Sequence, residues 1–208
     1  MLGGGGHASV LVDILKQKNR SIIGIVCPEV VMQREILAGF AHYQSDNDIL
    51  KFVSSDVFLI NGIGSLPGEQ LRKIIFLRCV KLGYQFETVI SSHAIVSPHA
   101  ELGEGVQIMP GAIVQVGAKI GDNTIINSGS IIEHDCVIGR HNHIAPGSTL
   151  SGQVTTADQV YIGTGAKVIN NLDIGLNSVI AAGAIVTKSV PGDAIVYAAR
   201  SKTRTKKD

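Results

Sequence analysis

The sequence predicts a small α/β domain over residues 1–90, a parallel β-helix over residues 91–190, and a C-terminal tail over residues 191–208. In the first unit, short apolar runs alternate with amphipathic stretches, as expected for strands and helices that build a parallel sheet. In the second unit, an aliphatic residue returns at every sixth position. That period fits neither an α-helix nor a single strand, and it is typical of a β-helix.

The α/β domain opens with a glycine run at residues 3–6, which leads into an amphipathic helix ending near residue 18. A second helix is predicted from Pro67 to Gly83, because proline is favoured in the first turn and glycine just past the last. A short helix is expected after Asp46. The opening strand has only two residues, so we expect the natural start of the protein to lie upstream of Met1. Three further strands are predicted, at residues 22–26, 57–61 and 86–90.

The β-helix is predicted from a regular sequence repeat. From Val96 to Val186, every sixth residue is aliphatic except Thr156, and the position two before it is usually small. Each short strand therefore sends one aliphatic side chain inward, and glycine-tolerant corners turn the chain. An aromatic content of 4% without tryptophan suits such a thin core.

Composition restricts the classes of partner. The net charge is +1, so no basic surface predicts binding to nucleic acid. Three widely spaced cysteines argue against a disulfide framework and for a reducing compartment. No signal peptide or membrane-spanning apolar run is evident. We therefore expect a cytoplasmic protein that binds neither nucleic acid nor membrane.

Two glycine loops predict a phosphate-binding site. Gly3, Gly5 and Ala8 have the G-x-G-x-x-G/A spacing, which lets backbone N–H groups approach a phosphate at a helix N-terminus. Residues 62–64 form a second glycine loop after a strand of the same sheet, and ligands of such sheets bind beyond the carboxyl ends of the strands. The acidic residue expected about 20 positions on is at best Glu29. A plain glycine turn into a helix is the structural alternative.

One corner of the repeat lacks glycine. Glu133, His134 and Asp135 follow the inward Ile132, so His134 should point outward. An imidazole beside a carboxylate is suited to act as a general base. An ordinary solvated turn is the alternative. Cys136 holds a small inward position and is therefore not expected to be a nucleophile.

The Gly3–His7 loop, the Asn61–Gly64 segment and the Ile132–Gly139 corner together resemble the bacterial sugar O- and N-acyltransferases of the sialic acid and bacillosamine type. The hexapeptides alone indicate only a left-handed β-helix. The resemblance covers nearly the whole chain. It implies a Rossmann-like N-terminal domain joined to a left-handed β-helix, a homotrimer with active sites between subunits, acetyl-CoA as co-substrate, and a nucleotide-sugar acceptor.

The same resemblance implies roles for individual residues. His134 matches the general base, and Asp135 matches its carboxylate partner. Residues that match the coenzyme site are His143 near the thioester, Gly152 with its N–H toward the acyl carbonyl, and Thr164 and Ala182 along the coenzyme. Residues expected at the nucleotide-sugar site are Gly5, His7, Gly64 and Glu29.

The predicted reaction is acetyl transfer from acetyl-CoA to the amine of a UDP-linked 4-amino sugar, by direct attack with His134 as base. O-acetylation of sialic acid or another sugar hydroxyl remains an alternative. So do a non-catalytic scaffold and a zinc hydratase, although the histidines lack a zinc-binding pattern and we expect no metal.

Overall fold

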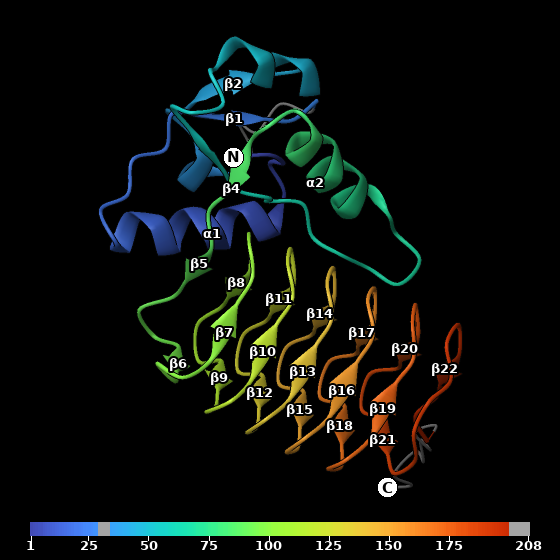
Figure 1. The fold of residues 1–208 in the computed structure, drawn as a ribbon. Helices are drawn as coiled ribbons and strands as arrows, with labels where there is room; N and C mark the ends of the chain where they lie inside the picture. Colours follow the sequence, from blue (N-terminus) through green and yellow to red (C-terminus); the bar gives the residue numbers. More distant parts are fainter. Residues whose placement is uncertain (29–33, 200–208) are drawn as a thin grey trace, which may run out of the picture.

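The computed structural model describes residues 1–28 and 34–199. In it a small α/β domain lies along one side of a long parallel β-helix (Figure 1). The α/β domain carries the N-terminus, and the coils of the β-helix follow one another in chain order toward the C-terminus. None of the helices within these residues is long and apolar enough to cross a membrane.

The α/β domain contains short strands and two α-helices. The helices are α1 (Gly6–Gln17) and α2 (Leu71–Lys81), with 3-10 turns η2 (Glu35–Leu37) and η3 (Asp46–Lys51) between them. The strands are β1 (Gly24–Val26), β2 (Ala41–Tyr43), β3 (Phe58–Leu59) and β4 (Gln85–Phe86).

Leu2 joins these strands into one parallel arrangement. β1 pairs with β2 and β3 pairs with β4, all in parallel. Leu2 forms parallel bridges to Val26 on one side and to Asn61 on the other. The spatial order is therefore residues 41–43, 24–26, 2, 58–61 and 85–86.

Several expected elements differ from the observed ones. The strands predicted at residues 22–26 and 57–61 are shorter, and β2 was not predicted. The predicted tail at residues 191–208 contains a further strand of the β-helix, Ile195–Val196. The helix predicted from Pro67 begins only at Leu71, because a turn occupies the residues before it. The strand predicted at residues 86–90 is divided between the two units. Phe86 ends β4, whereas β5 (Val89–Ile90) already pairs with a strand of the β-helix. The sequence pattern missed this change because Phe86 and Val89 are both buried apolar residues and read as one strand.

The β-helix has three parallel sheets, and one coil takes 18 residues, as the pairing of Lys119 with Val137 shows. The covered sheet, which faces the α/β domain, has strands β5, β8 (Gln107–Ile108), β11 (Ile125–Ile126), β14 (His143–Ile144), β17 (Tyr161–Ile162), β20 (Val179–Ile180) and β22 (Ile195–Val196). The aliphatic sheet has β6 (Ile95–Val96), β9 (Ile113–Val114), β12 (Ile131–Ile132), β15 (Thr149–Leu150), β18 (Lys167–Val168) and β21 (Ile185–Val186). The charged sheet has β7 (Glu101–Leu102), β10 (Lys119–Ile120), β13 (Val137–Ile138), β16 (Thr155–Thr156) and β19 (Asp173–Ile174).

The inward side chains lie as the repeat predicts. Every sixth residue from Ile108 to Val186 is at most 3% exposed. Thr156, the exception in the pattern, is buried as well, and its hydroxyl accepts a hydrogen bond from the Asn142 side-chain amide at 2.6 Å. The side-chain oxygen Oδ1 of Asn142 accepts from the Val160 N–H at 2.6 Å. This polar pair is therefore satisfied inside an aliphatic core.

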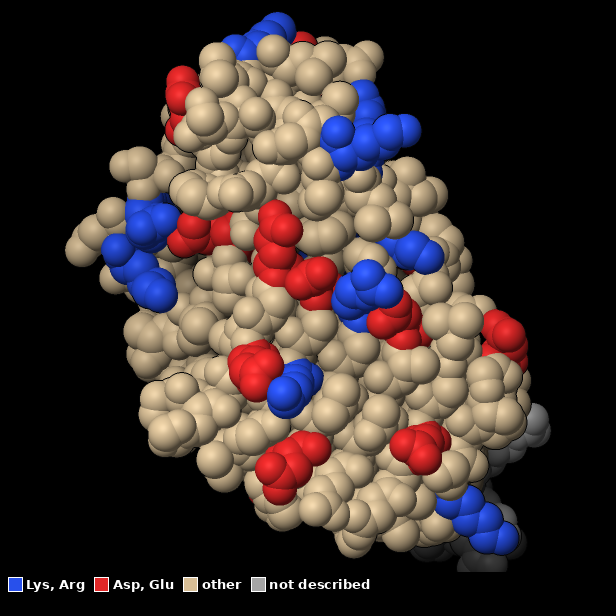
Figure 2. Space-filling view, in the orientation of Figure 1, with Lys and Arg blue, Asp and Glu red and all other residues tan. Residues whose placement is uncertain are grey.

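The three outer faces differ in character. The covered sheet is buried against the α/β domain, with Gln107 and Ile125 fully inaccessible. The charged sheet carries ion pairs such as Lys119–Glu101, and Figure 2 shows charged side chains of both signs scattered over this face. The aliphatic sheet exposes isoleucines, with Ile95 and Ile185 each 67% accessible. It is thus the apolar face that the chain itself leaves open.

Candidate active site

The corner between the aliphatic and charged sheets, here called the His134 edge, carries the predicted base. His134 Nδ1 lies 2.9 Å from Asp135 Oδ2, and both side chains are more than half exposed. An ionised carboxylate only accepts hydrogen bonds, so Nδ1 carries the proton and Nε2 keeps its lone pair. Asp135 has φ 58°, a left-handed conformation that Asp tolerates better than most residues. The pair therefore has the tautomer that a general base requires.

Gly152 occupies the equivalent corner one coil later and lies against the imidazole. A Cβ added there would be 2.5 Å from His134 Nε2 and 2.6 Å from Cε1. Among the described residues, no acceptor is seen for the Gly152 N–H. The basic nitrogen and a free backbone donor thus share one small patch.

Gly117, one coil before, makes room for the carboxylate. It has φ +75°, and a Cβ there would collide with Asp135 Oδ1. Glycines therefore border the His134–Asp135 pair on both neighbouring coils. The regular glycine pattern had suggested only turn formation at Gly117.

The structure places His143 at the junction of the two units, in β14 of the covered sheet. It is 8% exposed. Its Nδ1–H donates to the Ser65 carbonyl at 2.8 Å, and its Nε2 accepts from the Asn127 amide at 3.0 Å. Burial lowers the pKa of His143 to about 4. It is a neutral ring with both nitrogens engaged, and the Tyr161 ring packs edge-on against it at 5.0 Å.

His7 is held at the same junction. Its Nε2 lies 2.7 Å from Gln107 Oε1, an acceptor, so Nε2 donates and Nδ1 keeps the lone pair. Gln107 in turn donates to the Asn61 carbonyl at 2.8 Å. Burial, together with the charge of Arg72, lowers the pKa of His7 to about 4. Gln107 was missed in the sequence because it stands where the repeat normally places an unremarkable outward residue.

The two glycine loops lie side by side, as predicted. A Cβ on Gly3 would be 3.1 Å from the backbone of Gly62, and one on Gly64 would be 3.8 Å from the His7 Cβ. Gly5 precedes α1 as its N-cap and has open space around it. The structure therefore brings Gly5, His7 and Gly64 to the carboxyl ends of neighbouring parallel strands.

Thr164 and Ala182 lie on another corner, between the covered and aliphatic sheets, here called the Thr164 edge. Both are exposed, and the Gly183 N–H donates to the Thr164 carbonyl at 2.8 Å. The aliphatic sheet separates this edge from His134. One chain alone therefore does not bring Thr164 and Ala182 together with the base. Glu29 lies outside the described residues.

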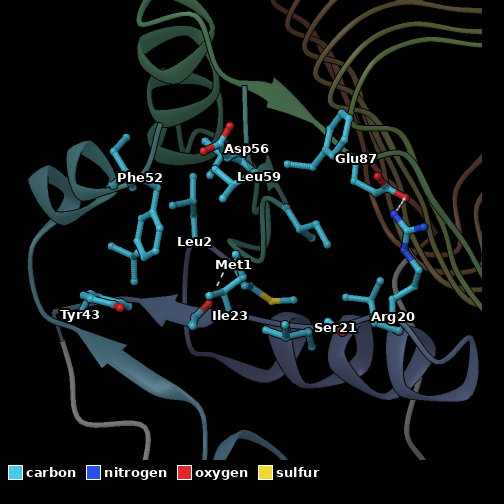
Figure 3. A pocket seen from close by; sticks show the side chains of 18 residues that line it. Met1, Leu2, Arg20, Ser21, Ile23, Tyr43, Phe52, Asp56, Leu59 and Glu87 are labelled. Atoms are coloured by element: carbon cyan, nitrogen blue, oxygen red, sulfur yellow. Dashed lines mark hydrogen bonds and ion pairs between the residues drawn. The ribbon is translucent and has the colours of Figure 1, made fainter. Parts of the chain in front are cut away.

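A cavity in the α/β domain lies elsewhere. It has a volume of about 270 Å³ and lies under the short opening strand, between the segments that precede β1 and β3 (Figure 3). The Met1 amino group donates to the Gly24 carbonyl at 2.9 Å within it. Of the predicted site residues that the structure describes, none lines it. No group of three or more His, Cys, Asp or Glu side chains suited to a metal ion occurs within residues 1–28 and 34–199.

The hexapeptide repeat matches a known family of repeats over part of the β-helix. The bacterial transferase hexapeptide model of six repeats matches residues 117–152, which include the His134 edge. Comparison with the curated proteins gave no match.

Solved structures match across both units. A mutant of perosamine N-acetyltransferase from Caulobacter crescentus, in complex with CoA and GDP-perosamine, is 27% identical with a TM-score of 0.81, covering 93% of this chain and 90% of that one. The acetyltransferase domain of PglB from Neisseria gonorrhoeae, in complex with acetyl coenzyme A, is 25% identical with a TM-score of 0.81, covering 91% and 90%. WeeI from Acinetobacter baumannii is 25% identical with a TM-score of 0.81, covering 93% of both chains. The resemblance to hexapeptide-repeat sugar acyltransferases is thereby confirmed over nearly the whole chain.

Proposed function

We propose that the protein transfers the acetyl group of acetyl-CoA to the amine of a nucleotide-linked amino sugar of the 4-amino type. This proposal rests on the His134 edge. There the His134 imidazole, with its proton on Nδ1 and a lone pair on Nε2, lies against Gly152, whose N–H has no acceptor among the described residues. Similarity to acetyltransferases solved with CoA, acetyl coenzyme A and GDP-perosamine supports the two substrates. The sequence predicts that the nucleotide carries uracil. Comparing UDP- with GDP-linked acceptors distinguishes uracil from guanine.

The chemistry follows from the geometry of this patch. Acetyl-CoA supplies the acyl group as an activated thioester. His134 Nε2 accepts the proton of the amine as it adds to the thioester carbonyl, which typically contributes ~10²–10⁴-fold in rate. Asp135 holds Nδ1–H and stabilises the imidazolium. The tetrahedral intermediate then collapses with cleavage of the C–S bond, and the imidazolium returns its proton to the departing thiolate of CoA. The Gly152 N–H is placed to donate to the oxygen that becomes negative, and one such donor is typically worth ~2.7–4 kcal/mol. Cys136 is fully buried with its pKa raised by burial, so it takes no part as a nucleophile.

The residues of the α/β domain support an acceptor site at the glycine loops. The strand order 41–43, 24–26, 2, 58–61 and 85–86 supports the proposal of a Rossmann-like domain. Such domains bind nucleotides in the crevice between their first and fourth strands. Both glycine loops border that crevice, so Gly5, His7 and Gly64 are proposed to contact the sugar nucleotide. The hexapeptide repeat supports a left-handed coil.

The division of the site between two edges supports a homotrimer. The His134 edge and the Thr164 edge flank the aliphatic sheet, whose isoleucines are exposed. A threefold axis would bury that apolar face and bring one copy's His134 edge to the next copy's Thr164 edge. His143, Thr164 and Ala182 are proposed as coenzyme contacts in this assembly. The buried thiol groups of Cys79 and Cys136 and the need for acetyl-CoA support a cytoplasmic location.

The test is thiol release from acetyl-CoA with a panel of acceptors, namely UDP- and GDP-linked 4-amino sugars beside free and nucleotide-linked sialic acid. Release with an amino sugar, lost in His134→Ala while the coenzyme still binds, is expected. Thiol release with the sialic acids alone would show that the acetylated group of the acceptor is a hydroxyl and not an amine. Normal turnover in His134→Ala would contradict the assignment of the base.

A further inference from the structure

A second, smaller cavity lies where the α/β domain meets the covered sheet. It is lined by the turn at residues 65–70, by Arg72 and Lys73 of α2, and by β-helix residues that include His141 and Gln159. Its volume is about 40 Å³, roughly three times the ~10–15 Å³ that a single water needs. It therefore has room for a few waters or one compact ion.

Arg72 is the unusual residue of this cavity. Its side chain is 5% exposed, and it donates from Nη1 to the Asn61 and Ile63 carbonyls at 2.8 and 2.7 Å and from Nε to the Asn123 carbonyl at 3.3 Å. Nη2 is buried and has no hydrogen-bond partner among the described residues. A buried cation that is neither fully bonded nor paired is costly.

The surroundings add positive potential instead of cancelling that charge. Lys73 donates from Nζ to Gln159 Oε1 at 2.8 Å. The N-terminus of α2, the positive end of its dipole, has no side-chain cap and no acidic residue in the first turn. Glu69 belongs to the lining but is exposed. No carboxylate in residues 1–28 and 34–199 forms an ion pair with Arg72 or Lys73.

The titration of a neighbouring histidine agrees with this picture. Burial lowers the pKa of His141 to about 4, and the charge of Lys73 is the next largest cause. The charge of Asp158 raises this pKa, whereas Arg140 and Arg72 lower it slightly further. The ring accepts from the Asn123 amide at Nδ1, so it is neutral. Protonated histidine is thus disfavoured at this position, as expected near uncompensated cations.

We propose that this cavity binds a compact oxyanion of the phosphate class, held by Arg72 Nη2, the Lys73 ammonium and the backbone N–H groups that open α2. The same guanidinium bonds the carbonyls of the second glycine loop through Nη1, so an anion here would fix the loop that borders the proposed nucleotide crevice. The phosphate class is favoured because a buried guanidinium and a helix N-terminus both match its oxygens.

The experiment measures thermal unfolding of the full chain against orthophosphate, at constant ionic strength set with potassium gluconate. Lys73→Glu reverses a charge that lines the cavity, and Lys81→Glu, exposed at the far end of the same helix, is the matched control. Wild type and Lys81→Glu are expected to share one saturable rise in unfolding temperature. In Lys73→Glu the dissociation constant should rise about tenfold or more, since one charge-assisted bond is lost and one repulsion gained. Arg72→Met should abolish the rise if that variant folds.

A second arm replaces orthophosphate by UDP and GDP, with uridine and guanosine as controls. A rise with the diphosphates alone, sensitive to Lys73→Glu, would place the phosphate of a nucleotide in the cavity. Equal shifts in all three proteins, or no shift with any of these ligands, would overturn the proposal. The orthophosphate arm requires no acetyl transfer, so its outcome is independent of the proposed activity.

Discussion

The imidazole of His134 lies directly against Gly152 of the following coil, so closely that a methyl group at residue 152 would be 2.5 Å from the basic Nε2. Gly152→Ala should therefore displace the ring and reduce kcat by about 10²-fold or more. Because the new methyl group meets only an exposed side chain, the unfolding temperature should change little.

Gly139→Ala provides the contrast for that variant. A Cβ at Gly139 would be 2.5 Å from the backbone of Ala157, which cannot move aside. This variant should lower the unfolding temperature by several degrees. Activity and thermal unfolding measured on both proteins separate the two effects, and wild-type kcat in Gly152→Ala would contradict the contact.

Asp135→Asn is expected to reduce kcat by about 10²-fold or more without unfolding the corner. Asn tolerates the φ of 58° found here, but its amide can donate to Nδ1 and so move the ring proton to Nε2. The measurement is kcat against pH, with coenzyme affinity expected to stay at the wild-type value. Asp193→Asn, at a second left-handed position with φ 57°, is the matched control and should remain active.

Stability should fall as the pH drops from 6.5 toward 4. Burial lowers the pKa of His7, His141 and His143 to about 4 each. In this window the unfolded chain takes up protons that the folded chain resists, so the free energy of unfolding decreases as the pH falls, by about 3 kcal/mol for each of the well-buried rings of His7 and His143. Urea unfolding at pH 7 and pH 5 measures this loss. His143→Gln should reduce the dependence, and an unchanged slope would exclude His143 as a contributor.

Gln107→Leu should weaken binding of the acceptor more than it changes kcat. The Gln107 side-chain amide accepts a hydrogen bond from His7 and donates one to the Asn61 carbonyl. Its loss therefore removes the bond that orients the His7 ring and the bond that holds the segment leading into the second glycine loop. The KM for the sugar nucleotide is expected to rise about tenfold, and the KM for acetyl-CoA should remain near the wild-type value. Gln85→Leu, at the exposed position of β4, serves as the control. Equal changes in both KM values would indicate a general loss of structure instead.

The β-helix was predictable almost residue by residue, since its core depends on a local period. Ile108 and each later inward residue are buried as the pattern requires. The His134–Asp135 pair was predictable because it breaks that period. Arg72 and Gln107 could not be found in this way. Arg72 is one of four basic residues in α2, and nothing in the sequence sets it apart from the other three. Its hydrogen bonds reach the Asn61, Ile63 and Asn123 carbonyls, so its burial depends on the contact between the two units and not on its neighbours in sequence.

Thr156 and Asn142 have a consequence for how the coils wind. The inward aliphatics are nearly interchangeable, so a strand shifted by a full coil of 18 residues would bury an almost equivalent set. Such a shift would place an aliphatic side chain where the Asn142 amide now finds the Thr156 hydroxyl, leaving a buried donor unmatched at a cost of roughly 1–3 kcal/mol. The buried hydrogen bond between Asn142 and Thr156 therefore distinguishes the native register of the coils from registers shifted by 18 residues. Thr156→Val combined with Asn142→Val should keep the folded core but lower the yield of correctly wound protein on refolding.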